Sequence, residues 1–268
     1  MQLNETQVSE FHAKGYVLIP GLLQGDEVAV LQAALLEILD RQGPEIVREK
    51  NNPTAARLAF GAHNYSEAFR CLSLLPRLLL PVRQLLNDEV YLHQSRINPK
   101  QGFGQGAAWD WHQDYPPWHT VDGMPEPRCV MTSVFLDDCD TVRSPLLVVP
   151  GSQRHGLLQS KPHEDAEGKG YELHHIDHAT LERLATEFGI EPLTGPAGSV
   201  AFVDCTVVHG SANNVSPWRR AIMYLIYNAV SNACTGTERP SYQNNRDFTP
   251  LQPLDDNCLI RMAEAKSN

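Results

Sequence analysis

The sequence predicts a mainly β protein, a sandwich or barrel in one domain with helices packed at its N-terminal side. Near the start, two leucine-rich segments carry apolar residues at helical spacing. From about residue 89, short segments rich in β-branched and aromatic residues alternate with segments rich in Gly, Pro, Asn and Ser. A helical start followed by many short strands is typical of a helix-flanked sandwich or barrel.

The helical part is expected over about residues 1–88 and the β core over about 89–250. The first helix is predicted at 25–43, with glycine at its end, and the second at 66–88, where Pro76 and Pro81 should break or kink it. A short helix is predicted at 179–189. The predicted strands are 89–98, 128–138, 144–151, 198–210 and 219–230.

Charge and composition exclude several classes of partner. The chain of 268 residues has a net charge of −10, which argues against binding nucleic acid through its phosphates. No apolar run approaches the roughly 20 residues that span a bilayer, and no secretory signal is visible. The six scattered cysteines fit reduced thiols. We therefore expect a cytoplasmic monomer or homodimer that acts on a small-molecule substrate, with no nucleic-acid or membrane partner.

A candidate metal site begins in the stretch WDWHQDYPPWH, residues 109–119. If this stretch is extended as far as Asp114, the side chains of His112 and Asp114 point to the same face. His209, where an apolar strand gives way to a loop, is the best third ligand. Two histidines and one carboxylate form the facial triad of non-haem Fe(II) oxygenases, with open positions for O2 and a co-substrate. The alternative is a surface histidine beside a solvated acid.

An arginine follows at the start of the last strand. The usual co-substrate of such an iron site, 2-oxoglutarate, has a distal carboxylate that an arginine fork can bind through two charge-assisted hydrogen bonds. Arg219 and Arg220 are adjacent, so only one can face the interior. The pattern leaves two inward-facing sets open: Ala221, Met223 and Leu225, or Ile222, Tyr224 and Ile226.

A second polar set lies on the strand predicted at 89–98. Gln94, Arg96 and Asn98 alternate and therefore share one face. That face is either exposed to solvent or forms a polar wall of a binding cavity. For a small zwitterionic substrate, Trp118 offers a π-face to a cation, and His119 and Arg128 are further candidate contacts.

Four segments together resemble a known family: HQDYPPWHTVDGMP, SPLLVVPGS, GPAGSVAFVDCTVVHGSANNVSPWRR and RPSYQNNRDFTPL. They resemble the phytanoyl-CoA dioxygenase superfamily, and within it the bacterial hydroxylases of small metabolites, the proline trans-4-hydroxylase and ectoine hydroxylase groups. The resemblance runs from about residue 10 to about residue 254. It implies a double-stranded β-helix, the cupin-like jelly roll, with N-terminal helices outside it.

The resemblance also implies roles for individual residues. His112, Asp114 and His209 would bind Fe(II) and form the catalytic centre. Arg220, rather than Arg219, would hold 2-oxoglutarate. The remaining implied contacts are Ser211, Asn98, Trp109 and Arg96 for the co-substrate, and Gln94 and Trp118 for the substrate. Asp114 favours hydroxylation, since related halogenases carry a small residue there.

The implied activity is hydroxylation of an unactivated C–H bond in a free imino or amino acid, such as proline, or in an ectoine-like compound. Two alternatives are the same chemistry on a larger secondary-metabolite intermediate, and a metal-binding β-barrel without activity. The run QDYPP after the first histidine departs from the ectoine hydroxylases, whereas His119 in the WHxxDGMP pattern departs from the proline hydroxylase.

Overall fold

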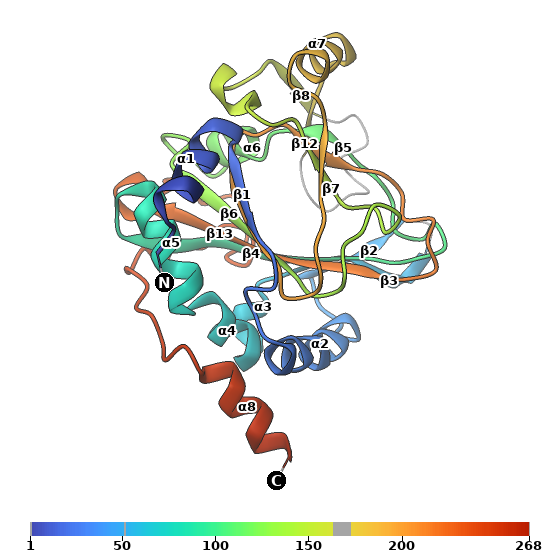
Figure 1. Cartoon of the computed structure of the whole chain (residues 1–268), viewed down its shortest axis with the longest axis vertical. Helices are drawn as coiled ribbons and strands as arrows, with labels where there is room; N and C mark the ends of the chain where they lie inside the picture. The colour runs from blue at the N-terminus through green and yellow to red at the C-terminus, as the bar shows by residue number, and fades with distance from the viewer. Residues whose placement is uncertain (1, 51, 163–172, 268) are drawn as a thin grey trace.

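The protein is described by a computed structural model that covers residues 2–50, 52–162 and 173–267 (Figure 1). Two antiparallel sheets face each other. The larger has the order β1 (Tyr16–Ile19), β11 (Val200–Asp204), β6 (Cys129–Phe135), β13 (Arg220–Ala229), β4 (Val90–Lys100), β3 (Asn52–Phe60) and β2 (Ile46–Glu49). The smaller has the order β10 (Glu191–Leu193), β7 (Leu146–Val148), β12 (His209–Ser211), β5 (Trp109–His112), β9 (His174–Ile176) and β8 (Ser160–Pro162).

Consecutive strands alternate between the two sheets. From β4 to β7, and again from β10 to β13, each strand lies in the sheet opposite its predecessor. This winding is that of a double-stranded β-helix, so the predicted fold class is confirmed. The strand predicted at 198–210 illustrates it, because the chain turns between β11 and β12 and passes from one sheet to the other.

In the described chain, five helices cover the outer face of the larger sheet and lie below it in Figure 1. Those on this side are α2 (Gly25–Leu39), α3 (Ala62–Tyr65), α4 (Glu67–Ser73), α5 (Pro76–Leu86) and α8 (Cys258–Ser267). The others are α1 (Glu5–Lys14), α6 (Tyr115–Thr120), α7 (His178–Phe188) and the short 3-10 helices at Ser152–His155 and Val230–Asn232. Among the described residues, no helix combines the length and apolar character needed to cross a bilayer.

Two expectations about the N-terminal part need correction. The segment predicted as one helix at 66–88 forms α4 and α5: Pro76 begins α5, where its missing N–H costs nothing, but Pro81 stays inside that helix. Residues before 89 are also not all helical. They supply β1, β2 and β3, which extend the larger sheet at both edges. The stretch now seen as β3 contains Arg57 and an early proline, Pro53, which hid its strand pattern.

Apolar residues form one cluster on each face of the larger sheet. On β13, Ala221, Met223 and Leu225 pack toward the helices, whereas Ile222, Tyr224 and Ile226 pack between the sheets. Both faces of this strand are buried because it lies in the middle of a sheet covered on both sides.

A buried ion pair ties the helical layer together. The guanidinium of Arg77 on α5 donates through Nη1 to Oε2 of Glu27 on α2 at 3.1 Å, and also bonds Oε1 through Nη2. Arg77 Nη2 donates in addition to the carbonyl of Asp256 at 3.0 Å, just before α8. Glu27 is completely buried, so its charge depends on this partner.

Replacing Arg77→Ala is expected to lower the free energy of unfolding by about 3–5 kcal/mol, because Glu27 would keep a buried charge without its cationic partner. Urea unfolding followed by circular dichroism measures this. The matched control is Arg70→Ala, which breaks the exposed Arg70–Glu67 pair on α4 and should cost less than about 1 kcal/mol. Equal losses in the two variants would contradict the importance given to the buried pair.

Candidate functional site

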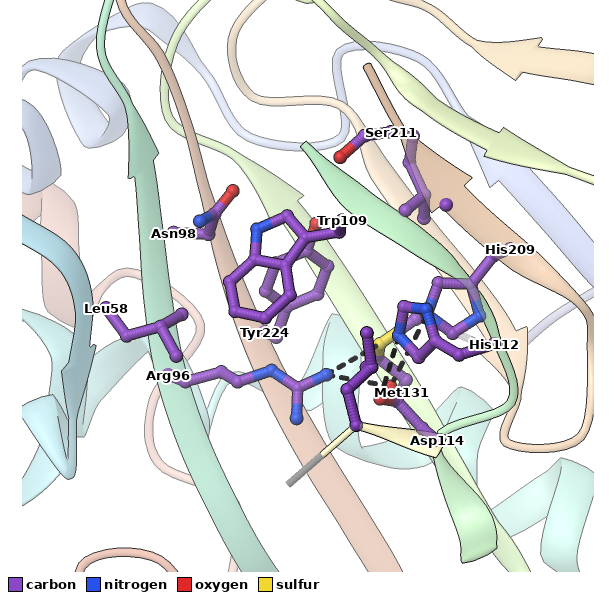
Figure 2. A pocket seen from close by; sticks show the side chains of 13 residues that line it. Leu58, Arg96, Asn98, Trp109, His112, Asp114, Met131, His209, Ser211 and Tyr224 are labelled. Atoms are coloured by element: carbon purple, nitrogen blue, oxygen red, sulfur yellow. Dashed lines mark hydrogen bonds and ion pairs between the residues drawn. The ribbon is translucent and has the colours of Figure 1, made fainter. Parts of the chain in front are cut away.

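Three candidate metal ligands meet between the two sheets. His112 ends β5 and His209 begins β12, and these two residues are directly paired across the antiparallel ladder. Their ring centroids lie 4.1 Å apart. One ligand atom from each of His112, Asp114 and His209 lies within 4.8 Å of the others, and all three residues are buried (Figure 2). The structure thus brings together the triad that the sequence predicted.

Asp114 reaches this position by a different route from the one expected. The strand ends at His112, and Asp114 adopts helical backbone angles as the N-cap of α6. Pro116 and Pro117 follow within the first turn of α6, where proline is well tolerated. The carboxylate therefore turns back toward both histidines, with Oδ1 3.6 Å from His112 Nε2 and Oδ2 3.7 Å from His209 Nε2.

The protonation states of the triad fit a divalent cation. His112 Nδ1 contacts the carbonyl of Asp110 at 2.6 Å, and His209 Nδ1 contacts that of Val207 at 3.0 Å. Since a carbonyl only accepts, each Nδ1 carries the proton and each Nε2 is left with a lone pair directed at the centre. Burial, then the neighbouring His112, lowers the pKa of His209 to about 4, so its ring is neutral at pH 7.

The carboxylate completes the ligand set. Burial raises the pKa of Asp114, but Arg96 and the two histidines outweigh it and hold the pKa well below its usual range. Arg96 Nη2 donates to Asp114 Oδ2 at 2.7 Å, whereas Oδ1 is buried with no hydrogen-bond partner in the described chain. A buried anionic oxygen without a partner is costly, and a cation at this point would remove that cost. Two imidazoles and one carboxylate suit Fe(II).

A cavity extends from the triad. Arg96, Met131 and Leu146 contribute to its walls. Farther from the triad lie Asn98 and Ser211 (Figure 2). The other residues that line it are Leu58, Trp109, Leu173, Gly210 and Tyr224.

Two buried cations stand behind the Asn98–Ser211 end. Arg220 donates through Nε and Nη2 to the carbonyl of Ser144 at 3.0 and 2.7 Å, and through Nη1 to Asn98 Oδ1 at 3.3 Å. Lys100 Nζ donates to Ser211 Oγ and to the carbonyl of Ala212, both at 2.7 Å.

Neither cation has an ion-pair partner among the described residues. Burial, then Arg220, holds the pKa of Lys100 well below its usual range. Buried charges are normally paired, so this end of the cavity is suited to an anion.

The structure also decides between the adjacent arginines. Arg219 points away from the cavity and holds the Asp137 carboxylate through Nε at 2.8 Å and Nη2 at 2.9 Å. Arg220 shares its strand face with Tyr224, which lines the cavity. The sequence left two sets of β13 residues as candidates for the inward face. The set that faces the cavity side is therefore Ile222, Tyr224 and Ile226.

None of the four predicted substrate contacts lines the cavity. Gln94 accepts from Arg96 Nη1 at 2.8 Å and donates to the carbonyl of Gln243 at 2.6 Å. Trp118 is fully buried against His93, and its indole N–H has no hydrogen-bond partner within the described ranges. Gln94 and Trp118 both adjoin Arg96, which does line the cavity.

The other two predicted substrate contacts are held elsewhere. His119 Nδ1 contacts the carbonyl of Met124 at 2.8 Å. Arg128 is not brought to the site, because its guanidinium pairs with Asp88 at 3.0 Å and also donates to Ser231. Its predicted place beside the substrate therefore needs correction.

The sequence reasoning missed several residues at the site. Lys100 continues the alternation of Gln94, Arg96 and Asn98 by one more step, so that pattern could have found it. Arg57 on β3 stacks over the ring of Trp109 at 4.0 Å and pairs with Glu49. No local sequence pattern indicated that Arg57 would lie at the site. The apolar lining residues Leu58, Leu146 and Leu173 carried no distinguishing signal in the sequence.

Comparison with known proteins gives consistent relatives. The chain is 37% identical to the L-proline trans-4-hydroxylase of Streptomyces griseoviridis over 250 residues, which cover 90% of this chain and 92% of that protein. It is also 37% identical to the ectoine dioxygenase of Bordetella bronchiseptica over 273 residues, with 96% and 88% covered. Among solved structures, EctD from S. alaskensis with 2-oxoglutarate and 5-hydroxyectoine matches with a TM-score of 0.82 and 34% identity, covering 94% of this chain and 87% of that one.

A more distant structure, the non-haem α-ketoglutarate-dependent carbocyclase SnoK, shares the fold with a TM-score of 0.67 at 21% identity, covering 94% of both chains. The phytanoyl-CoA dioxygenase (PhyH) family profile matches residues 11–222. With a family match over most of its length and close relatives along nearly all of it, this chain belongs to the phytanoyl-CoA dioxygenase family.

Proposed function

We propose that the protein is an Fe(II)- and 2-oxoglutarate-dependent dioxygenase that hydroxylates an unactivated C–H bond of a small free metabolite. The observation that carries this proposal is the pairing of two features in one cavity. A buried triad of two histidines and a carboxylate lies at one end. Two buried cations without anionic partners in the described chain lie behind the other. A bidentate metal ligand with a distal carboxylate matches this arrangement.

Each residue of the site would have a separate task. His112, Asp114 and His209 would hold Fe(II), and their buried, hydrogen-bonded positions fix the ligand geometry in advance. Arg220 and Ser211 would bind the distal carboxylate of 2-oxoglutarate. Asn98, Trp109 and Arg96 would complete the lining around the co-substrate.

The bound iron would supply O2 activation coupled to decarboxylation of 2-oxoglutarate to succinate and CO2, with one oxygen atom inserted into the substrate. The protein supplies binding, orientation and exclusion of water. Leu58, Leu146 and Leu173 make much of the wall apolar, which keeps competing reactions with water away from the metal. Arg96 holds Asp114 in place from the side opposite its unpartnered oxygen.

The named relatives favour a small substrate. Relatives that carry the names proline trans-4-hydroxylase and ectoine dioxygenase support an imino or amino acid such as proline, or an ectoine-like compound. A larger secondary-metabolite intermediate is the second candidate, but the two solved structures from nogalamycin biosynthesis, SnoK and SnoN, share only the fold with this chain, at 18–21% identity.

A reducing compartment suits the cysteines. All six are buried thiols. This supports our proposal that the enzyme works in the cytoplasm. Its state as a monomer or homodimer remains a prediction.

Anaerobic addition of Fe(II) and 2-oxoglutarate should produce a weak visible charge-transfer band. Asp114→Ala should lose both the band and hydroxylation, because the metal would keep only two protein ligands. The matched control is Asp110→Ala, which removes an exposed carboxylate on the same strand but keeps the carbonyl that holds His112. Undiminished turnover in Asp114→Ala would remove that residue from the triad.

Arg220→Ala should weaken 2-oxoglutarate binding at least about 10-fold, the usual value of one charge-assisted hydrogen bond. Isothermal titration into Mn(II)-loaded, non-turning-over protein gives the dissociation constant. Arg219→Ala is the control and should leave it unchanged, since Arg219 holds Asp137 outside the cavity. The opposite order of effects would mean that β13 has been assigned the wrong face.

A succinate-release screen decides the substrate class. Proline, pipecolate, other free amino acids and ectoine are each supplied with Fe(II), 2-oxoglutarate and O2. One of them should stimulate succinate release in step with formation of a hydroxylated product. Stimulation only by compounds much larger than ectoine would favour the second candidate instead.

A further inference from the structure

Tyr224 occupies a central place in the cavity wall that no assigned role explains. It lies on β13, paired with Arg96 on β4 and with Ser133 on β6. Its ring lies 5.4 Å from the Arg96 guanidinium and lines the same cavity as the metal triad. In Figure 2 it lies between the triad and the Asn98–Ser211 end.

The hydroxyl of Tyr224 makes no hydrogen bond to the described part of the chain, although the residue is only 7% exposed. Buried tyrosine hydroxyls normally have a partner. Two other buried tyrosines follow that rule: Tyr227 donates to the carbonyl of Ser73 at 2.8 Å, and the Tyr91 hydroxyl accepts from Asn228 Nδ2 at 2.9 Å. Because Tyr224 lines the cavity, its hydroxyl is open to an atom of a bound ligand.

The surrounding charges indicate which ligand atom this is. Burial raises the pKa of Tyr224, so the hydroxyl is a neutral donor at pH 7. Among the charged neighbours, Arg220 opposes this rise most, then Arg96, while Asp114 acts least. Tyr224 also shares its face of β13 with Arg220, whose guanidinium bonds Asn98 at the distal end.

The distal end has room for another donor. A carboxylate offers about four acceptor positions. In the described chain, Arg220 directs three of its five N–H groups at the Ser144 carbonyl and Asn98, so two remain. Ser211 accepts from Lys100, which leaves its own O–H free to donate. The fourth position falls either to the one N–H that Lys100 has left or to a hydroxyl of the cavity wall.

We propose that Tyr224 is a further co-substrate-binding residue, and that its hydroxyl donates a hydrogen bond to the distal carboxylate of 2-oxoglutarate beside Arg220 and Ser211. This inference rests on the proposed function and names one more residue of the same site. It also gives a reason for tyrosine rather than phenylalanine at a position where the ring alone would fill the space.

The test is Tyr224→Phe, which removes one oxygen atom and keeps the ring. Two ligands are titrated into Mn(II)-loaded protein: 2-oxoglutarate, and 2-oxovalerate, which carries a methyl group in place of the distal carboxylate. The variant should bind 2-oxoglutarate about 10-fold more weakly, the lower value for a hydrogen bond to a charged group. Its affinity for 2-oxovalerate should be unchanged. Its melting temperature without ligand should not fall, since no protein contact is lost.

Tyr227→Phe is the matched control, three residues along the same strand and facing the helices. It loses the bond to Ser73, so its melting temperature should fall while its affinity for 2-oxoglutarate stays that of the unmodified protein.

Three results would overturn the proposal, and a fourth would overturn the proposed function on which it rests. Unchanged 2-oxoglutarate affinity in Tyr224→Phe overturns it, and so does an equal loss for both oxo acids. A rise only in the KM of the hydroxylated substrate would place the hydroxyl against that molecule and also overturns it. If the unmodified protein fails to bind 2-oxoglutarate, the proposed function itself is wrong, and this outcome is distinct from the others.

Discussion

The site depends on one cross-strand pair, His112 on β5 opposite His209 on β12. Residues far apart in sequence become ligands of one centre because the antiparallel ladder fixes their register. A slip of one residue would turn both side chains to the other face of the sheet. The alternation of strands between the sheets then puts β4 and β13 opposite this pair, and these two strands supply Arg96, Tyr224 and Arg220.

Charge is distributed unevenly along the cavity, and this asymmetry favours one orientation of a bound ligand. At the triad, Arg96 and Asp114 are paired, so the protein supplies both signs of charge there. At the other end, Lys100 and Arg220 are held by neutral oxygen atoms of Ser211, Ala212, Ser144 and Asn98. A ligand with a carboxylate at the far end balances this excess, and its other end then meets the metal. Orientation thus follows from where the protein leaves charge uncompensated.

The sequence alone could predict the triad because its signals are local: an HxD pair among tryptophans, and a histidine where an apolar strand ends. It could not choose between Arg219 and Arg220 from the pattern, because both faces of β13 are apolar and buried. Lys100 lies where the sequence suggested a turn, at the end of a strand longer than expected.

Trp118 shows a different limit of sequence reasoning. An aromatic side chain that packs beneath a site and one that touches its ligand have the same local sequence. Trp118 is fully buried and adjoins Arg96 and His93, but it does not line the cavity. Only the packing of α6 against the sheets could reveal this.

Ser144 shows how the arginine is held ready for its ligand. It is one of three non-glycine residues with positive φ in the described chain, at 57°, a conformation that costs a residue with a Cβ of order 1 kcal/mol. That conformation accompanies a carbonyl that accepts from both Nε and Nη2 of Arg220, while its hydroxyl donates to the Ala212 carbonyl at 2.5 Å. Lys100 donates to the same Ala212 oxygen. The two cations are therefore linked through Ser144, whose carbonyl holds Arg220 and whose hydroxyl shares the Ala212 carbonyl with Lys100. The protein itself bears the cost of arranging them before any anion arrives.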